Sequence, residues 1–283
     1  MIDIIRQRLA TYSARNALEE EQATKEILQE VALYLLWRGG FFEVAAFQGG
    51  TSLRILHRLP RFSEDLDFIL RQPDAAFDWG LYLKPLLVGL TEFGLKSDVL
   101  DKSKMDRNIR EALIKNDSIA NQLNLKFDRG RSSPTLKIKL EIDVNPPAGS
   151  GFAHTYLDFP LDFEIRHQDL PSNFALKIHA LLCRPYLKGR DWYDFNWYIR
   201  QNVRPNVPLL QAALDQMGPW KDQHPTIDIQ WVVDELQKKI SAIDWRAASA
   251  DVERFVPLPD RESLKLWSAR FFSSRAVRLI NAE

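Results

Sequence analysis

The chain has 283 residues, of which 45% are hydrophobic and 27% charged, so it can bury a sizeable core and has the balance of an ordinary globular protein. Its 38 basic residues equal its 38 acidic residues, which excludes a globally basic nucleic-acid binder and leaves RNA only a local patch. One cysteine, Cys183, excludes an intrachain disulfide and suits a reducing cytoplasm. The first residues lack the pattern of a signal peptide, and no apolar run approaches the ~18 residues of a membrane span, so we expect a cytoplasmic protein.

Helical and extended segments alternate through the first hundred residues. Asn16 and Glu19 form the pattern of a capping box ahead of apolar residues at helical spacing. Pro60 and Gly94 mark helix ends, because proline blocks continuation and glycine favours a C-terminal cap. These patterns predict, in chain order, a helix over residues 17–38, a strand over 44–47, a helix over 51–59, a strand over 65–70 and a helix over 76–93.

The middle of the chain is predicted to be mostly extended. A polar stretch contains a short predicted helix over residues 109–114. Two alternating segments, 122–127 and 134–144, follow as strands, and the polar residues 128–133 between them predict a hairpin loop. In the second strand, apolar residues at 136, 138, 140 and 142 face one way, and charged residues at 137, 139, 141 and 143 face the other.

From Ser172 onward the apolar spacing becomes helical, with Ser172 as a predicted cap and Gly189 as a break. The predicted helices cover residues 173–184, 191–201, 207–217, 227–243 and 260–278. The sequence therefore predicts an α+β fold. A domain over 1–165 has a mixed sheet with flanking helices, and an all-α domain follows over 166–283.

Two features of the first domain are suited to binding phosphate and metal. At Gly49-Gly50-Thr51 a strand turns into a helix, so backbone N–H groups can approach a phosphate and the helix start adds partial positive charge. Asp65 and Asp67 lie two residues apart on a predicted strand, so both carboxylates project from one face. They can reach one divalent ion or a close pair, and carboxylates suit Mg²⁺.

A third acidic feature is the pair Glu141 and Asp143, again two apart on one strand face. A phosphate-binding turn with three carboxylates on adjacent strands meets the needs of two-metal nucleotidyl transfer. One ion lowers the pKa of the attacking hydroxyl, and the other neutralises the leaving pyrophosphate. Taken alone, a Gly-Gly turn is usually a plain turn, and alternating acidic residues usually mark a strand face exposed to solvent. Only the order and spacing of the three features together favour nucleotidyl transfer.

Two segments, GGTSLR at 49–54 and RFSEDLDF at 61–68, resemble the signature of a known family. This is the AbiEii/AbiGii abortive-infection toxin family, which belongs to the DNA polymerase β-like nucleotidyltransferase superfamily. Residues 139–147 are similar to the family's second motif, in which an acidic residue completes a metal triad. The resemblance implies a nucleotidyltransferase-like first domain. It also implies Mg²⁺, with Mn²⁺ as the alternative, held by Asp65, Asp67 and either Glu141, which we favour, or Asp143.

Two downstream segments, 176–181 and 188–194, resemble further motifs of that family. The resemblance implies that Lys177 and Asp191 serve nucleotide binding or catalysis and that Arg190 contacts phosphates. From the residues alone, a partly buried Lys177 needs an anionic partner, which is either a nucleotide phosphate or Asp191 in a structural ion pair. Arg190 could instead cap a domain interface. Ser63 is either a loop serine bonded to the backbone or a phosphate contact or modification site.

The resemblance implies an enzyme that binds an NTP with Mg²⁺ and transfers a nucleoside monophosphate to a hydroxyl acceptor. The expected acceptor is a tRNA 3′ end or another RNA. The expected role is the toxin of a toxin–antitoxin or abortive-infection system in phage defence, with a separately encoded antitoxin as partner. Two alternatives stay open: a small molecule or protein as acceptor, and a nucleotide-binding module without catalysis.

Overall fold

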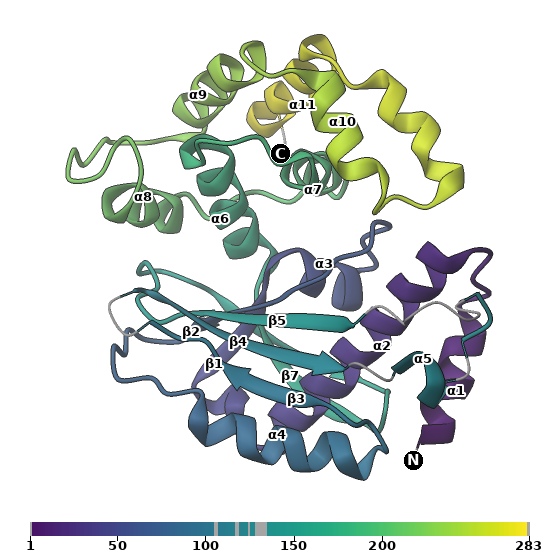
Figure 1. Ribbon diagram of the computed structural model, residues 1–283. Helices are drawn as coiled ribbons and strands as arrows, with labels where there is room; N and C mark the ends of the chain where they lie inside the picture. The colour runs from purple at the N-terminus through teal and green to yellow at the C-terminus, as the bar shows by residue number, and fades with distance from the viewer. Residues whose placement is uncertain (1, 105–106, 117–118, 124, 128–134, 282–283) are drawn as a thin grey trace. The chain divides into compact units, whose positions relative to one another are not determined.

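A computed structural model describes residues 2–104, 107–116, 119–123, 125–127 and 135–281 (Figure 1). The chain divides into two compact units. The predicted domain boundary between residues 165 and 166 stays a prediction. Unit 1 comprises Met1–His57, Phe62–Pro146 and Ala153–His167, and unit 2 comprises Arg58–Arg61, Pro147–Phe152 and Gln168–Glu283.

The described residues of the first part of the chain form a seven-stranded mixed sheet. Its strands are β1 (Ala45–Gln48), β2 (Leu66–Leu70), β3 (Asp98–Asp101), β4 (Ile109–Asn116), β5 (Leu136–Asp143), β6 (Phe152–Leu157) and β7 (Phe163–Gln168). The strand order is β3-β4-β5-β2-β1-β7-β6. β2 lies at the centre, antiparallel to β1 and parallel to β5, while β4 pairs antiparallel with both β3 and β5.

One face of this sheet is apolar and packs against two helices, α2 (Ala17–Arg38) and α4 (Gly80–Glu92) (Figure 1). Phe47 and Phe68 are register partners on this face and belong to one buried cluster with side chains of both helices. Gly89 lets the helices approach, because a Cβ there would overlap Leu35. The other described helices of unit 1 are α1 (Ile2–Thr11), the 3₁₀ turn η1 (Phe41–Glu43), α3 (Gly49–His57) and α5 (Ile119–Leu123).

The predicted helix over 17–38 is confirmed to the residue, and Asn16 caps it by accepting a 3.0 Å bond from the Glu19 N–H. Glu19 itself accepts from the N–H of Arg15, so the reciprocal half of a capping box is absent here. The helix predicted over 51–59 begins two residues earlier, at Gly49. The predicted strands over 44–47 and 65–70 correspond to β1 and β2.

The helix predicted over 109–114 is wrong, because these residues lie in β4. Residues at even positions of β4 are buried, and most of those between them are half-buried, which is the two-residue period of a strand. Glu111, Ala112 and Leu113 favour a helix by propensity, but pairing with a strand on each side overrides that preference.

The strand predicted over 122–127 is wrong for its described part, since residues 119–123 form α5. The hairpin loop predicted over 128–133 lies outside the described residues. The strand predicted over 134–144 is confirmed as β5, with its apolar side chains buried. β3, β6, β7 and α1 are not predicted from the sequence, because each is short and β3 and β6 are half-exposed or exposed throughout.

All the described elements that follow β7 are helices, and they lie in unit 2. They are α6 (Leu170–Cys183), α7 (Gly189–Arg200), α8 (Val207–Gln216), α9 (Ile229–Ser241), α10 (Trp245–Glu253), the 3₁₀ helix η2 (Leu258–Leu266) and α11 (Ala269–Asn281). The helix predicted over 260–278 is thus divided into η2 and α11, and α10 is additional. Of the helices in the described ranges, none is both long and apolar enough to cross a membrane.

Two predicted boundaries in unit 2 are corrected. Asp169, not Ser172, caps α6, because its carboxylate accepts from the Ser172 N–H and Pro171 fits the first turn. Gly189, predicted as a break, is the first residue of α7. A Cβ at Gly189 would overlap the backbone carbonyl of Ala248, so close packing against α10 explains the glycine.

Candidate active site

The turn between β1 and α3 is built around Gly49. Its φ of +77° lies in the region that favours glycine. Gln48 of β1 is the register partner of Asp67, which brings the Asp67 carboxylate against the turn. A Cβ on Gly49 would lie only 2.5 Å from Asp67 Oδ2. The glycine turn and the aspartate strand therefore form one assembly.

The side chain of Thr51 is buried, and its hydroxyl donates to the backbone carbonyl of Asp65. This bond ties the segment that carries the aspartates to α3. Ser52 Oγ donates to the Gly49 carbonyl at 2.9 Å, and Gly50 is buried as the second residue of the helix. The Thr51 hydroxyl thus positions Asp65, so a phosphate at this turn would be contacted by backbone groups.

The sheet register places Glu141 of β5 beside Asp67 of β2. Register partners on parallel strands project from the same face, so both carboxylates lie on the polar face, opposite α2 and α4. Lys139 lies on that face too, and its Nζ is 2.5 Å from Glu141 Oε1 and 3.3 Å from Glu111 Oε1. The structure therefore brings Glu141 next to Asp67 but gives it a lysine partner.

Asp143, the alternative third carboxylate, is the register partner of Ile69, two residues beyond Asp67. Its Oδ1 accepts a 2.9 Å bond from the Asn145 N–H, which closes the turn after β5. Burial raises the pKa of the Asp143 carboxyl, and the bond from Asn145 lowers it only in part. Of the two candidates for the third carboxylate, Glu141 is the one that is a register partner of Asp67.

Asp65 and Asp67 have the hard oxygen donors that suit Mg²⁺, which commonly takes one or two carboxylates together with substrate phosphates. The described residues include no group of three His, Cys, Asp or Glu side chains placed to hold a metal ion. The aspartate pair therefore fits a magnesium site completed by substrate. Glu141 would join it only by exchanging its bond to Lys139.

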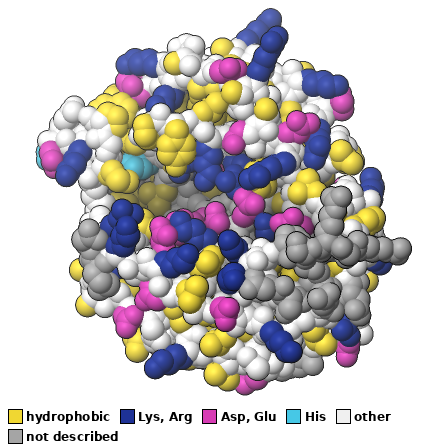
Figure 2. All heavy atoms as spheres, viewed as in Figure 1, with side chains coloured by type: hydrophobic (Ala, Val, Ile, Leu, Met, Phe, Trp, Pro, Cys, Tyr) yellow, Lys and Arg dark blue, Asp and Glu magenta, His cyan; other side chains and the backbone are white. Residues whose placement is uncertain are grey.

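A groove of about 380 Å³ in unit 1 opens beside Asp65. Four lysines and two further acidic residues line it. On the viewed face of the molecule, basic and acidic side chains are intermingled, in keeping with the zero net charge (Figure 2). The charged residues that line the groove with Asp65 are Lys25, Lys102, Lys137, Lys139, Glu64 and Glu111.

Ser63 lies in the loop between α3 and β2, two residues before Asp65. Its carbonyl accepts a 3.2 Å bond from Gln29 Nε2, which fixes the loop to α2. The neighbouring Glu64 lies 3.5 Å from Lys25 of the same helix. The loop is thus held in place through its backbone and Glu64, and the proposed phosphate contact of Ser63 stays a prediction.

Unit 2 contains a buried network of ion pairs. Lys177 Nζ lies 2.7 Å from Asp191 Oδ1 and 3.0 Å from Asp194 Oδ2. Arg61 holds Asp194 in a bidentate pair at 2.7 and 2.6 Å. Arg184 Nη1 donates to the other oxygen of Asp191. The predicted Lys177–Asp191 pair is therefore present, as part of a larger network.

This network carries more positive than negative charge, since three cations share two carboxylates. Burial alone would raise the pKa of Asp191, but Lys177, Arg184 and Lys188 lower it to about 2. Burial lowers the pKa of Lys188, and neighbouring cations lower it further against the effect of Asp191. Lys188 has no ion pair among the described residues. A partly buried excess of positive charge suits an anionic ligand.

The sequence by itself indicates no role for Arg61. The spacing of seven residues between Lys177 and Arg184 does predict that both lie on one helix face, and the structure brings both to Asp191. The bond of Arg61 to Asp194 spans 133 residues, so no local pattern indicates it. Arg190 lies with its guanidinium 4.4 Å from the ring centre of Phe255.

The chain is similar to known proteins in sequence and in fold. A family model described as nucleotidyl transferase AbiEii toxin, type IV toxin–antitoxin system, matches residues 31–269. The crystal structure of JHP933 from Helicobacter pylori is 15% identical over 93% of this chain and 94% of that chain, with a TM-score of 0.52. MenT4, a nucleotidyltransferase toxin from Mycobacterium tuberculosis, is 17% identical over 97% and 98%, with a TM-score of 0.49. No curated protein matches the chain. The likeness to JHP933 agrees with the predicted α+β fold, which is confirmed.

Proposed function

The chain belongs to the nucleotidyl transferase AbiEii toxin family, and from this premise we propose that it transfers a nucleoside monophosphate from an NTP to a hydroxyl of an RNA. The 3′ end of a tRNA is the acceptor we expect first. The transfer depends on Mg²⁺, with Mn²⁺ as the alternative ion. The biological role is that of a cytoplasmic toxin restrained by a separately encoded antitoxin, and phage defence is the expected setting.

The contact between Gly49 and Asp67 carries this proposal. It joins the start of α3, where backbone N–H groups and the helix dipole favour phosphate, to a carboxylate that suits a divalent ion. The bond from Thr51 to the Asp65 carbonyl supports the same arrangement from the other side. A phosphate and a metal ion could therefore be held by one rigid turn.

In the proposed reaction, Asp65, Asp67 and Glu141 would hold the ion, and Glu141 would give up its bond to Lys139 to do so. Bound Mg²⁺ would neutralise phosphate charge and lower the pKa of the acceptor hydroxyl. The backbone at Gly49 and Gly50 orients the phosphates. Glu141, once freed, lies next to Asp67 and favours loss of the hydroxyl proton.

Lys177 supplies positive charge toward the triphosphate, and Asp191 orients it. Asp191 stays ionised because the cations around it lower its pKa to about 2, so it can hold Lys177 and Arg184 at any physiological pH. Arg190 is the weakest of the proposed phosphate contacts, because its guanidinium already lies over Phe255.

The test incubates the purified chain with Mg²⁺, total RNA and each α-³²P-labelled NTP in turn. We expect label in RNA for the wild type and none for the Asp65→Ala/Asp67→Ala double variant. Asp98→Asn, which changes an exposed strand aspartate of the same unit, is the matched control and should label normally. Equal label with the double variant would refute the proposal.

Two further outcomes separate the alternatives. Label that appears in protein or in a small molecule, with none in RNA, would change the acceptor and keep the enzyme. No label in any acceptor, together with NTP binding measured by calorimetry, would leave a nucleotide-binding module without catalysis.

A further inference from the structure

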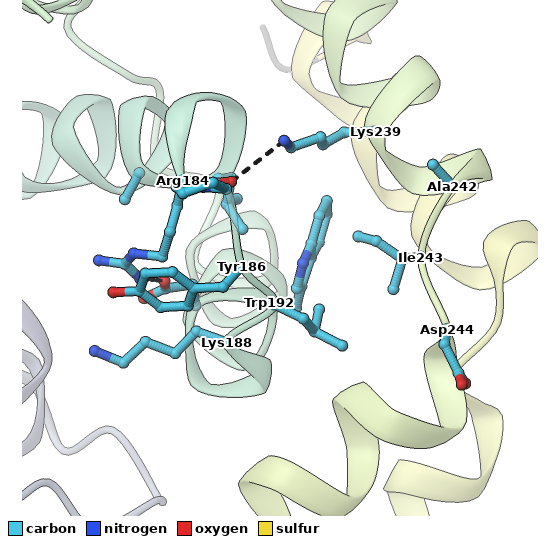
Figure 3. A pocket seen from close by; sticks show the side chains of 13 residues that line it. Arg184, Tyr186, Lys188, Trp192, Lys239, Ala242, Ile243 and Asp244 are labelled. Atoms are coloured by element: carbon cyan, nitrogen blue, oxygen red, sulfur yellow. Dashed lines mark hydrogen bonds and ion pairs between the residues drawn. The ribbon is translucent and has the colours of Figure 1, made fainter. Parts of the chain in front are cut away.

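Two cavities of unit 2 differ in the charges that line them. The larger, about 330 Å³, is bordered by Arg184 and Lys188 and belongs to the ion-pair network described above (Figure 3). The smaller, about 140 Å³, is lined by residues of α7, η2 and α11 and contains none of the residues assigned to the nucleotide. Small-molecule sites begin at ~300 Å³, so the smaller cavity suits one group of a larger ligand.

The walls of the smaller cavity are largely aromatic. Trp197 of α7 and Trp267, which follows η2, are 7% and 9% exposed. Tyr193 and Phe271 are half-buried, and the ring centres of Tyr193 and Trp267 lie 6.5 Å apart. Leu266 also lines the cavity and is 62% exposed. A flat group such as a nucleobase can stack on rings of this kind.

The same lining contains two arginines, Arg200 and Arg275, and no Asp or Glu among the residues that the structure describes. Arg275 Nε is buried and has no hydrogen-bond partner in the described part of the chain. Burial lowers the pKa of Arg275, and the charges of Arg278 and Arg200 lower it further, with no acidic residue opposing them. The three guanidinium groups therefore repel one another, and a bound anion would relieve that repulsion.

The sequence of α11 extends this positive charge along the surface. The helix contains Arg270, Arg275 and Arg278 and no acidic residue. Arg278 follows Arg275 by three positions, so the two lie on neighbouring parts of one helix face, and Arg278 Nη2 donates to Asn202 Oδ1 at 3.3 Å. A chain with zero net charge can bind a polyanion only through such a local group of cations.

We propose that the smaller cavity is a binding site for single-stranded RNA, with one base against the aromatic walls and neighbouring phosphates on Arg200, Arg275 and Arg278. This inference rests on the proposed function, because it names where the RNA acceptor is held. The site lies wholly in unit 2. An acidic protein segment would match the arginines but not the rings, so RNA is the better match for the whole lining.

The test measures binding of a fluorescent single-stranded RNA of about 12 nucleotides to the full chain by anisotropy, without NTP, over a range of salt. We expect Arg200→Gln/Arg275→Gln to raise the Kd about tenfold and to make the slope of log Kd against log salt shallower by about 1.4, since each phosphate contact on a single strand contributes about 0.7. An oligomer with the same phosphates but without bases should bind the wild type about tenfold more weakly, because it cannot stack.

Leu266 offers a matched pair of variants at an exposed position of the lining. Leu266→Glu adds a carboxylate that repels phosphates and should weaken RNA binding severalfold, whereas Leu266→Gln has the same shape without the charge and should bind like the wild type. Arg246→Gln, at an exposed arginine of α10 outside the lining, should also bind like the wild type. Melting temperatures within about 2 °C of the wild type would show that the variants fold.

Wild-type affinity for RNA in both Arg200→Gln/Arg275→Gln and Leu266→Glu, with transfer to RNA intact, would overturn the site and leave the proposed function standing. Polyglutamate that competes with the RNA as well as an unlabelled RNA of equal charge would also overturn it, in favour of an acidic protein segment. A wild type that neither binds nor labels RNA would overturn both the site and the RNA acceptor.

Discussion

The acidic residues of the two units have the same chemistry and opposite surroundings. Asp67 and Glu141 lie half-exposed on the polar face of the sheet in unit 1. Asp191 and Asp194 are 4% and 0% exposed in unit 2, and each is held by two cations. Half-exposed carboxylates can exchange partners and take up a metal ion. Buried ones can only hold the cations around them, because an unpaired buried charge is costly.

The largest effect should come from the half-exposed carboxylates, and it should fall on activity alone. Asp67→Asn removes a charge that faces the metal and the phosphates, so we expect the transfer rate to drop about 10³-fold or more. The melting temperature should stay within about 2 °C, because the side chain is not part of the core. Initial rates and thermal melts on the same sample measure both, and a loss below tenfold would contradict the role given to Asp67.

The buried network should show the reverse pattern, with the main loss in stability. Arg61→Ala leaves the fully buried Asp194 with Lys177 as its remaining cation among the described residues, so we expect a loss of roughly 3–5 kcal/mol in unfolding free energy. Arg38→Ala breaks an exposed pair with Glu92 and should cost less than about 1 kcal/mol. Urea unfolding compares the two variants. Similar losses of unfolding free energy in both variants would show that burial does not make the Arg61–Asp194 pair more important for stability than the Arg38–Glu92 pair.

Two glycines with positive φ test whether the turn acts on Asp67. Gly49→Ala and Gly40→Ala should each cost about 1–2 kcal/mol, because φ of +77° and +74° strains any other residue. Only at Gly49 would the new Cβ push against the Asp67 carboxylate. We therefore expect Gly49→Ala to lower transfer about 10²-fold, as an ångström of misplacement can, and Gly40→Ala to leave it unchanged. Equal transfer rates in the two variants would show that the turn at Gly49 does not position Asp67 for the reaction.

The smallest effect concerns pH. The pKa of Asp191 is about 2 in the folded chain, below its ordinary value of about 3.9, so the unfolded chain binds more protons between these values. The stabilisation by ionised Asp191 is therefore complete above about pH 4 and is lost as the pH falls toward 2. We expect the difference in unfolding free energy between wild type and Asp191→Asn to shrink from pH 5 to pH 2.5. A constant difference would show that Asp191 is not held ionised by its partners.

Much of unit 1 could be predicted because its signals are local. The helix over 17–38 has its own cap and apolar spacing, and β5 alternates apolar and charged residues over its whole length. The glycine at 189 was less informative, since it was predicted as a break and instead begins α7. β4 could not be predicted, because its helix-forming composition is overridden by two neighbouring strands.

The sequence by itself determined that two aspartates two residues apart follow a glycine turn, and that a lysine and an aspartate follow downstream. It did so because strand and helix periods fix which neighbours share a face. Only the tertiary structure decided that Gly49 touches Asp67, that Lys139 holds Glu141, and that Arg61 lies on Asp194. These contacts depend on strand register and on chain segments far apart in sequence. Their energies come from burial and from the partners that folding brings together, and no local pattern records either.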